Sequence, residues 1–389
     1  SIQYTVDDGQ GGTDTTTLFI TVNGVNDAPT AQDDAVTASE DTILNGDLTA
    51  DNGSGPDSDP DQGDIPFISE VNGEAANIGS QITLGSGALL VVNGSGTFTY
   101  DPNDQFETLN SGETATDSFT YTLQDSEGAT DTATVTVTIN GNADLPVAVD
   151  DTATTDEDSA TTGAVLTNDT DADGDTLTVS EVNGEAGDVG NQITLASGAL
   201  LTMGGDGTFD YDPNGAFEGL AVGESDTDSF TYTVSDGNGG TDTATVTITI
   251  DGVNDAPTAR PDTFSTDEET TLSGLDLFAN NGGGADSDPD ISDVLSVTQV
   301  NGEATDVGSQ ITLASGAFLT VNVDGTASYD PNGAFNGLSA GVTANDSFTY
   351  QVSDGNGGTD TATATVIITG VNDDPDAVDD GLNVAVDAA

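Results

Sequence analysis

The sequence predicts an all-β chain of tandem β-sandwich domains, and three features of its 389 residues support this prediction. The chain repeats with a period of 111–118 residues, its apolar residues alternate with polar ones, and Asp-Gly, Asn-Gly and Gly-Gly pairs separate the alternating runs. Alternation with period two is typical of antiparallel strands that turn one face to a core and the other to water. No segment shows a convincing helical apolar stripe.

Recurring motifs define the length of one unit. Tyr-Asp-Pro triplets begin at Tyr100, Tyr211 and Tyr329, which are 111 and 118 residues apart. A unit of this length is the size of one domain. We expect three complete repeats at 28–145, 146–256 and 257–374, the C-terminal part of a preceding repeat at 1–27, and the first strand of a following repeat at 375–389. The partial ends indicate a window from a longer tandem array.

The second repeat shows the strand pattern most clearly. Ala244, Val246, Ile248 and Ile250 share one face of the segment 243–250, and four Thr residues share the other. The same reasoning predicts about seven strands in this repeat, at 147–154, 161–166, 176–182, 191–196, 199–203, 207–211 with 228–235, and 241–250. About seven short strands in a unit of this size are typical of a β-sandwich.

Composition excludes several classes of function. The chain has one Arg, no Lys, no His and no Cys, and its 70 acidic residues give a formal net charge of −69. The usual zinc, copper, haem and iron–sulfur sites need His or Cys, as do the Ser–His–Asp and Cys–His nucleophiles. Binding to nucleic acid needs a basic face, so a nucleic-acid partner is excluded. We expect no membrane span, because no apolar run approaches about 18 residues, and no signal peptide is visible.

The acidic residues are mostly Asp, with 56 Asp against 14 Glu. Asp favours turns and is a hard oxygen ligand for Ca²⁺. Asp169, Asp171 and Asp173 alternate before a Gly, like the first half of an EF-hand loop, but position 12 is Ser180 and a strand follows. The loops 57–61 and 286–290 keep the alternation. We therefore predict calcium-type acidic loops that are not EF-hands; solvated acidic turns are the alternative.

Each unit ends in a recurring motif that carries a family resemblance. Residues 228–242 read Asp-Ser-Phe-Thr-Tyr-Thr-Val-Ser-Asp-Gly-Asn-Gly-Gly-Thr-Asp, and a Thr/Val/Ile strand then leads into Val-Asn-Asp-Ala-Pro. The whole chain resembles the VCBS-type, bacterial cadherin-like tandem repeats of large secreted (RTX-type) adhesins. The resemblance implies Ig-like or cadherin-like sandwiches arranged end to end, an extracellular location at the bacterial cell surface, and Ca²⁺ at the domain junctions.

The resemblance also implies ligands at each junction, which we name by its linker proline. They come from an acid near the first strand, an acidic turn before the penultimate strand, the Asn-Asp linker, and the Asp-x-Asp loop and Asp-Gly turn of the next domain. At Pro257 the matching residues are Glu157, Asp226, Asp228, Asn254, Asp255, Asp286, Asp288 and Asp354. At Pro146 they are Glu40, Asp117, Asp144, Asp171, Asp173 and Asp236, with Ala143 in place of the linker Asn. At Pro29 they are Asn26, Asp27, Asp57, Asp59 and Asp125.

Two functions from different classes follow. The first is a calcium-stiffened, rod-like spacer in a surface adhesin that serves cell adhesion or biofilm formation. The second is a structural subunit of a self-assembling extracellular filament or matrix. A carbohydrate-binding face is a weaker third, because aromatic residues make up only 5% and Trp is absent. Paired carboxylates also occur in glycosidases, but acids that recur at the turns of every repeat suit a structural ion better, so we expect no enzyme. The expected partners are Ca²⁺, adjacent repeats of the same chain, and like chains in a fibre.

Overall fold

The computed structural model describes residues 1–372. The predicted first strand at 375–389 and the linker at Pro375 lie outside the described residues. The chain divides into two compact units. The first comprises residues 1–147 with the loops 169–177 and 235–242, and the second comprises 148–168, 178–234 and the chain from 243 onward. The acidic loop that follows each linker therefore falls in the same unit as that linker.

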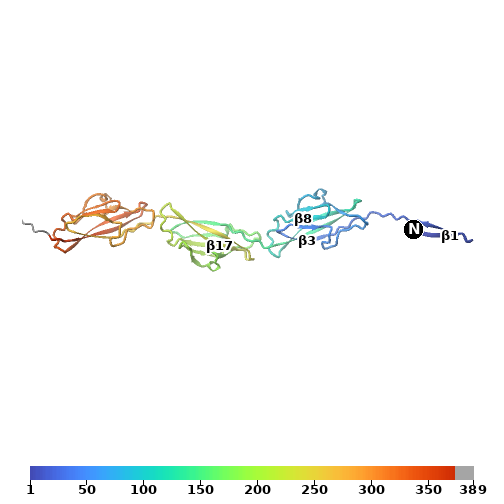
Figure 1. Ribbon diagram of the computed structural model, residues 1–389, viewed down its shortest axis with the longest axis horizontal. Coiled ribbons are helices and arrows are strands. Elements are labelled where there is room, and N and C mark those ends of the chain that lie inside the picture. Colours follow the sequence, from blue (N-terminus) through green and yellow to red (C-terminus); the bar gives the residue numbers. More distant parts are fainter. Residues whose placement is uncertain (373–389) are drawn as a thin grey trace, which may run out of the picture. The chain divides into compact units, whose positions relative to one another are not determined.

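The first complete repeat consists of two four-stranded sheets (Figure 1). One sheet has the order β3 (Asp34–Ser39), β10 (Thr130–Asn140), β9 (Thr114–Gln124), β5 (Phe67–Val71). The other has the order β4 (Leu44–Asp47), β8 (Thr97–Asp101), β7 (Leu89–Val92), β6 (Ile82–Thr83). β3 and β10 pair in parallel, whereas the other neighbours are antiparallel. A one-turn 3₁₀ helix, η1 (Ala75–Asn77), follows β5.

The second repeat has the same two sheets. The first has the order β11 (Asp151–Asp156), β18 (Thr241–Asp251), β17 (Ser225–Ser235), β13 (Thr178–Val182). The second has the order β12 (Thr161–Ala164), β16 (Thr208–Asp212), β15 (Leu200–Met203), β14 (Gln192–Thr194). Two 3₁₀ turns, η2 (Val165–Thr167) and η3 (Ala186–Asp188), complete this repeat. The structure has eight strands where about seven were predicted, because the segments 207–211 and 228–235, counted together, form β16 and β17 in different sheets. Most strand ends agree with the prediction to within a few residues.

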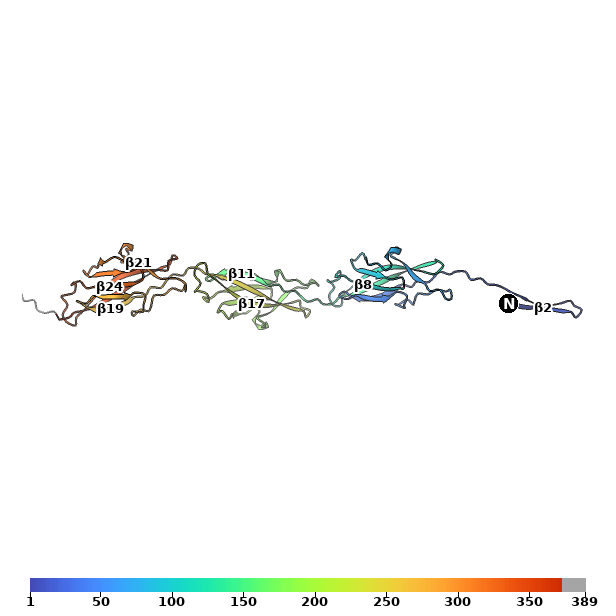
Figure 2. The ribbon, with the colours of Figure 1, turned by 45° about the horizontal axis from the view of Figure 1, so that its top comes forward.

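The third repeat, coloured orange in Figure 2, also keeps this order of strands. One sheet has the order β19 (Asp262–Asp267), β26 (Thr359–Thr369), β25 (Thr343–Ser353), β21 (Ser296–Val300). The other has the order β20 (Leu272–Asp276), β24 (Thr326–Asp330), β23 (Phe318–Val321), β22 (Ile311–Thr312). A 3₁₀ turn, η4 (Ala304–Asp306), follows β21. Before the first repeat, β1 (Ile2–Asp7) and β2 (Thr13–Leu18) form an antiparallel hairpin. The predicted all-β fold of tandem sandwiches is confirmed. No helix in residues 1–372 is long and apolar enough to cross a membrane.

Alternation places the apolar residues in the cores. On β10, Ala133, Val135, Val137 and Ile139 are buried, whereas the Thr residues between them face outward or are only half-buried. Between the two sheets of the first repeat, the rings of Phe98 and Phe119 meet edge to face with centroids 6.0 Å apart. Burial of such faces supplies most of the stabilisation of a small sandwich, at about 25 cal/mol per Å² of apolar surface. Each repeat thus has a core large enough to hold its loops in place.

Asp34 is a buried carboxyl group at the start of β3, and it makes stability depend on pH. Its side chain is 4% exposed, and burial raises its pKa from 3.8 to about 6. Because the folded-state pKa lies above the unfolded value, the acid form favours the folded state, and this stability is lost as pH rises through about 6. We expect Asp34→Asn to gain about 1–3 kcal/mol relative to wild type between pH 4 and 7.

Hydrogen exchange of the first repeat in chelator, at a series of pH values, measures this effect. The control is Asp33→Asn, because Asp33 is the exposed neighbour of Asp34 and its carboxylate only accepts a bond from the Thr134 amide. Equal pH dependence of stability in the two variants would show that the Asp34 carboxyl does not cause it.

Candidate metal centre

Each acidic loop is hydrogen-bonded along the linker that precedes it. In the second unit, Thr258 and Ser287 exchange two backbone hydrogen bonds, of 2.7 and 3.1 Å. Nearer the linker's start, the amide of Asp255 donates to Oδ2 of Asp290 at 3.0 Å. These bonds hold the loop 286–290 against the linker. They bring acids that lie some 35 residues apart in sequence into one site.

The first unit contains two copies of this arrangement. At Pro146, Val147 pairs with Thr170 through bonds of 2.7 and 3.0 Å, and the amide of Asp144 donates to Oδ2 of Asp173 at 2.8 Å. At Pro29, equivalent bonds join Thr30 to Ser58 and the amide of Asp27 to Oδ2 of Asp61. The recurrence at all three linkers shows that the pairing belongs to the fold rather than to one loop sequence.

Carboxylates from separate segments converge on the Pro257 linker. Three overlapping groups each place one oxygen per residue within 4.8 Å of the others. The groups are Glu157 with Asp255 and Asp290, Asp158 with Glu218 and Asp255, and Asp288 with Asp290 and Asp293. We call these seven residues the Pro257 cluster. Glu157 and Asp290 are only 2% and 1% exposed, so part of the cluster is shielded from water.

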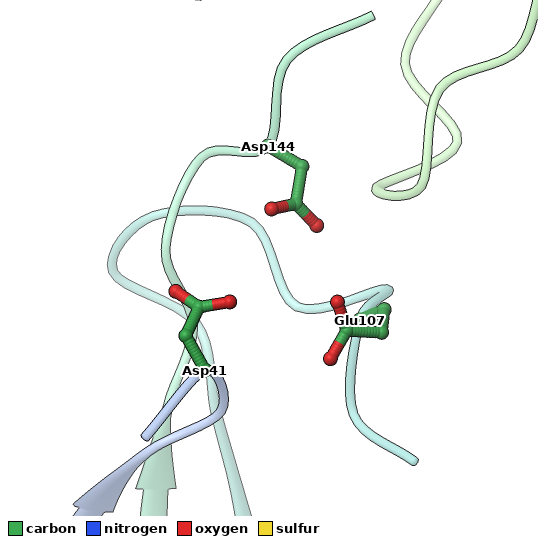
Figure 3. A group of neighbouring side chains, drawn as sticks. All are labelled: Asp41, Glu107 and Asp144. Carbon is green, nitrogen blue, oxygen red and sulfur yellow. The ribbon is translucent and has the colours of Figure 1, made fainter. Parts of the chain in front are cut away.

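A similar set surrounds the Pro146 linker. Asp41, Glu107 and Asp144 come from three separate segments of the chain, and Figure 3 shows their carboxylates turned toward a common space. Their oxygens lie within 4.8 Å of one another, as do those of Asp171, Asp173 and Asp175 in the following loop. We call these six residues the Pro146 cluster. The bond from Asp144 to Asp173 joins its two halves.

Buried oxygens without a donor provide the test of whether a cation fits. Within the described residues, thirteen buried side-chain oxygens have no hydrogen-bond partner, and most of them lie at the linkers. They include Oε2 of Glu40, Oδ2 of Asp144, Oδ2 of Asp171 and Oδ1 of Asp173 at Pro146, and Oε2 of Glu157, Oδ1 of Asn254, Oδ2 of Asp255, Oδ2 of Asp288 and Oδ1 of Asp290 at Pro257. A buried acceptor without a partner is costly. Several oxygens, mostly carboxylate, without a donor match the ligand set of Ca²⁺.

The charges at these sites are of one sign. Burial, together with repulsion from neighbouring carboxylates such as Asp290, raises the pKa of Glu157 and of Asp255. At Pro146, burial and the carboxylate of Asp173 raise the pKa of Asp144. The single basic residue of the chain, Arg260, is in neither cluster. A divalent cation would offset both the burial cost and the repulsion.

The turns that begin at Asp125, Asp236 and Asp354 lie near the linkers, and their carboxylates accept bonds from nearby amides. Asp125 is followed by Ser126, so its turn is not an Asp-Gly turn. Oδ1 of Asp354 accepts from the amides of residues 356–358, and Oδ2 accepts from Nδ2 of Asn254 at 3.0 Å. Asp125 makes the same bond to Asn26 at 2.8 Å, and this bond is the largest of the effects that lower its pKa. Asp236 likewise accepts from its own turn amides. These turns tie the linker Asn to the next domain at Pro29 and Pro257.

The structure does not bring all the predicted ligands together. Glu157, Asp255 and Asp288 are members of the Pro257 cluster, and Asp144, Asp171 and Asp173 are members of the Pro146 cluster. Glu40 is 2% exposed and accepts from the Asn142 amide of the same linker. At Pro29, Asp27 bonds to the loop through its amide, and the buried Oδ2 of Asp59 has no donor.

Thirteen of the nineteen predicted ligands belong to neither cluster, and the carboxylates of five of these are bonded elsewhere. Asp117 accepts from the Tyr100 hydroxyl at 3.0 Å and from Ser86 at 2.6 Å. Asp228 is bonded in the same way in the second repeat, and the carboxylate of Asp226 caps the next amide on the exposed end of β17. Asp57 and Asp286 turn inward to core tyrosines. The acidic turn predicted before the penultimate strand is part of that strand, because Asp117 lies within β9 and Asp226 and Asp228 lie within β17. Asp117 and Asp228 each hold a tyrosine, and none of the three contributes an oxygen to the groups described above.

Two glutamates in the clusters were not singled out from the sequence. Glu107 and Glu218 lie in the long loops after β8 and β16, and each follows a Phe, in a Phe-Glu-x-Leu motif. The recurrence of that motif is the signal that could have found them. Each loop packs closely on its linker, because a Cβ on Gly252 would lie 2.3 Å from the Leu220 carbonyl oxygen. Asp61 and Asp290 were also missed, although they align with Asp173.

Comparison with known proteins identifies the class of domain. Three segments, 26–141, 143–252 and 254–370, match the bacterial cadherin-like domain. The chain therefore belongs to this family and carries three of its domains in tandem. Cadherin-like repeats are typically structural modules without catalysis.

One solved structure agrees with this assignment at the level of fold, and a second is reported for its similarity alone. The protocadherin gamma B2 extracellular cadherin domains 1–5 match with a TM-score of 0.53 and 17% identity, over 96% of this chain and 66% of that one. Mouse cadherin-23 EC22–24 matches with a TM-score of 0.46 and 13% identity, over 89% and 99% of the two chains. The chain thus spans just under two thirds of the protocadherin fragment. No curated protein sequence matches.

Proposed function

We propose that this chain is a calcium-stiffened, extracellular segment of a bacterial surface adhesin of the VCBS or RTX type. In this role it serves as a rod-like spacer in cell adhesion or biofilm formation. The repeats would run over 28–145, 146–256 and 257–374, with Ca²⁺ and adjacent repeats as the partners. The observation that carries the proposal is the set of buried oxygens without donors at the linkers.

The proposed mechanism follows from charge. A formal net charge of −69 opposes compaction, and the linker acids concentrate that repulsion where one domain follows another. At Pro257, the ion would be held by oxygens of Glu157, Asp255 and Asp290, which come from the preceding domain, the linker and the following domain. Bound there, Ca²⁺ would neutralise the acids and fix the linker to both domains. Without it, the linker would be free to bend.

The affinity for Ca²⁺ would determine whether the segment is stiff inside or outside the cell. Extracellular calcium modules commonly have a Kd of about 10⁻⁴–10⁻³ M. Such sites are loaded outside the cell and empty inside it. A chain that is flexible or partly unfolded before export, and stiff after it, suits passage through a narrow secretion channel followed by extension from the surface.

Sedimentation velocity over a range of protein concentrations, in millimolar Ca²⁺ and in chelator, tests the proposed role. A spacer is expected to remain a monomer at every concentration and to sediment more slowly in Ca²⁺, because a stiffer chain has more friction. Concentration-dependent growth in Ca²⁺ would instead favour a structural subunit of an extracellular filament. Identical monomer profiles in both buffers would contradict the calcium mechanism.

A further inference from the structure

We propose that two buried tyrosine hydroxyls, those of Tyr121 and Tyr350, position the calcium loops from inside the sandwich core. Each holds the first Asp of its loop, so that the later Asp residues of that loop face the cation. The inference rests on the proposed calcium binding and names the core groups that would set its affinity. It gives Asp57 and Asp286, which the sequence suggests as ligands, the role of anchors.

The third repeat shows the contacts that support this role. Tyr350 on β25 is fully buried, and its hydroxyl lies 3.2 Å from Oδ2 of Asp286. The other carboxylate oxygen, Oδ1, accepts from the amide of Arg260 at 2.6 Å. Asp286 therefore joins the core tyrosine to the segment that follows Pro257. Oδ1 is occupied by the amide, and Oδ2 shares the single Tyr350 hydroxyl proton with Oδ2 of Asp262, in contrast to the unpaired oxygens of Asp288 and Asp290.

The position of Asp286 fixes the later Asp residues because they follow it closely along the loop. Ser287, next to Asp286, is paired with Thr258, and the amide of Asp290 donates to Oδ1 of Asp288 at 3.0 Å. Pro289 stands between these two aspartates, and its ring fixes φ at about −65°. Only one residue separates each aspartate from the next, so a displaced Asp286 would carry the ligands with it.

The first repeat has the same arrangement of tyrosine, aspartate and backbone amide, with a different loop sequence. The Tyr121 hydroxyl lies 3.1 and 3.0 Å from the two oxygens of Asp57, and Oδ1 of Asp57 accepts from the Gln32 amide at 2.8 Å. The Tyr121 hydroxyl also lies 3.0 Å from the Gln32 carbonyl oxygen. Gln32 occupies the place of Arg260, so the contact depends on backbone groups and not on that side chain.

Removal of the hydroxyl would disturb the anchor in a defined way. The Tyr350 hydroxyl also lies 2.8 Å from Oδ2 of Asp262, which is 1% exposed. Without the hydroxyl, Oδ2 of Asp262 and Oδ2 of Asp286 would face each other with no donor between them, and repulsion would drive the more mobile side chain outward. Asp286 is on a loop, whereas Asp262 is on β19. The loop would therefore leave its position along the linker.

Hydrogen exchange of the full chain during a Ca²⁺ titration tests the inference at one linker. In Tyr350→Phe, we expect the Ca²⁺ concentration that half-protects the loop 286–293 to rise about tenfold, with the loop 171–175 unchanged as an internal control. Tyr329→Phe is the matched variant, because Tyr329 is equally buried in the same repeat but bonds Asp346. Its loop midpoint is expected to stay within about twofold of wild type.

Asparagine variants provide a second measurement that does not depend on how well Tyr350→Phe folds. The Asn amide can still bond a tyrosine hydroxyl, which both donates and accepts. Asp286→Asn should therefore shift the midpoint less than threefold, whereas Asp288→Asn should shift it by tenfold or more. Equal shifts for Tyr350→Phe and Tyr329→Phe, or a larger shift for Asp286→Asn than for Asp288→Asn, would overturn the positioning role. A wild-type loop that does not respond to Ca²⁺ would instead overturn the proposed function itself.

Discussion

Asp290→Asn is expected to weaken Ca²⁺ binding at the Pro257 linker by about 10–100-fold, equivalent to about 1.4–2.7 kcal/mol. Asp290 is 1% exposed, and its carboxylate belongs to two of the three acidic groups at this linker. Its Oδ2 already accepts from the Asp255 amide, whereas Oδ1 has no hydrogen-bond partner. The variant removes a full negative charge and leaves an amide that is a weaker ligand.

Isothermal titration calorimetry of the full chain with Ca²⁺ measures this effect as weaker binding at the sites of one linker. The matched control is Asp210→Asn, which removes the same charge from an exposed position on β16 outside the acidic clusters. It should leave the isotherm unchanged. An equal loss of affinity in both variants would show that the chain attracts Ca²⁺ through its overall charge and not through the Pro257 cluster.

Removal of calcium is expected to lower the stability of every domain that contributes to a linker site. With a Kd of about 10⁻⁴ M and 2 mM Ca²⁺, linkage gives about 2 kcal/mol for each site. For a domain of roughly 110 residues, this corresponds to a fall in Tm of about 8–15 °C. The buried acids at the linkers gain from the ion because their oxygens otherwise have no donor.

Differential scanning calorimetry in Ca²⁺ and in chelator provides the measurement. NaCl at matched ionic strength is the control, because salt screens the repulsion between exposed charges without supplying a ligand. The expected result is a large shift in Ca²⁺ and a small one in NaCl. If NaCl reproduced the shift, general screening of the −69 charge would account for the stabilisation.

Local sequence pattern was enough to predict the fold. The alternation on segments such as 243–250 predicts strands with one buried face, and β18 buries Ala244, Val246, Ile248 and Ile250. The repeat spacing predicts tandem units, and three matching domains are found. The strand pattern depends on residues close together in the chain, so it can be predicted from local sequence alone.

The details of the candidate site depend on long-range contacts and were harder to predict. Asp228 lies among acids and close to a strand, but its carboxylate accepts a hydrogen bond from the hydroxyl of Tyr211 on β16. Glu218 comes from a loop that folds back onto the linker, and only the recurrence of the Phe-Glu-x-Leu motif could have indicated it. Strict alternation also suggested that Asp286 and Asp288 share one role, whereas the core hydroxyl of Tyr350 holds only the first of them.

Small-angle X-ray scattering of the full chain, recorded in chelator and across a Ca²⁺ titration, tests the central claim most directly. If calcium at the linkers stiffens the segment, the maximum dimension should rise and the profile should approach that of a thin rod as the sites fill. The transition should occur near the calcium concentration at which the loops become protected from hydrogen exchange. An identical profile with and without Ca²⁺ would contradict the account, because the linker acids would then be a solvated surface.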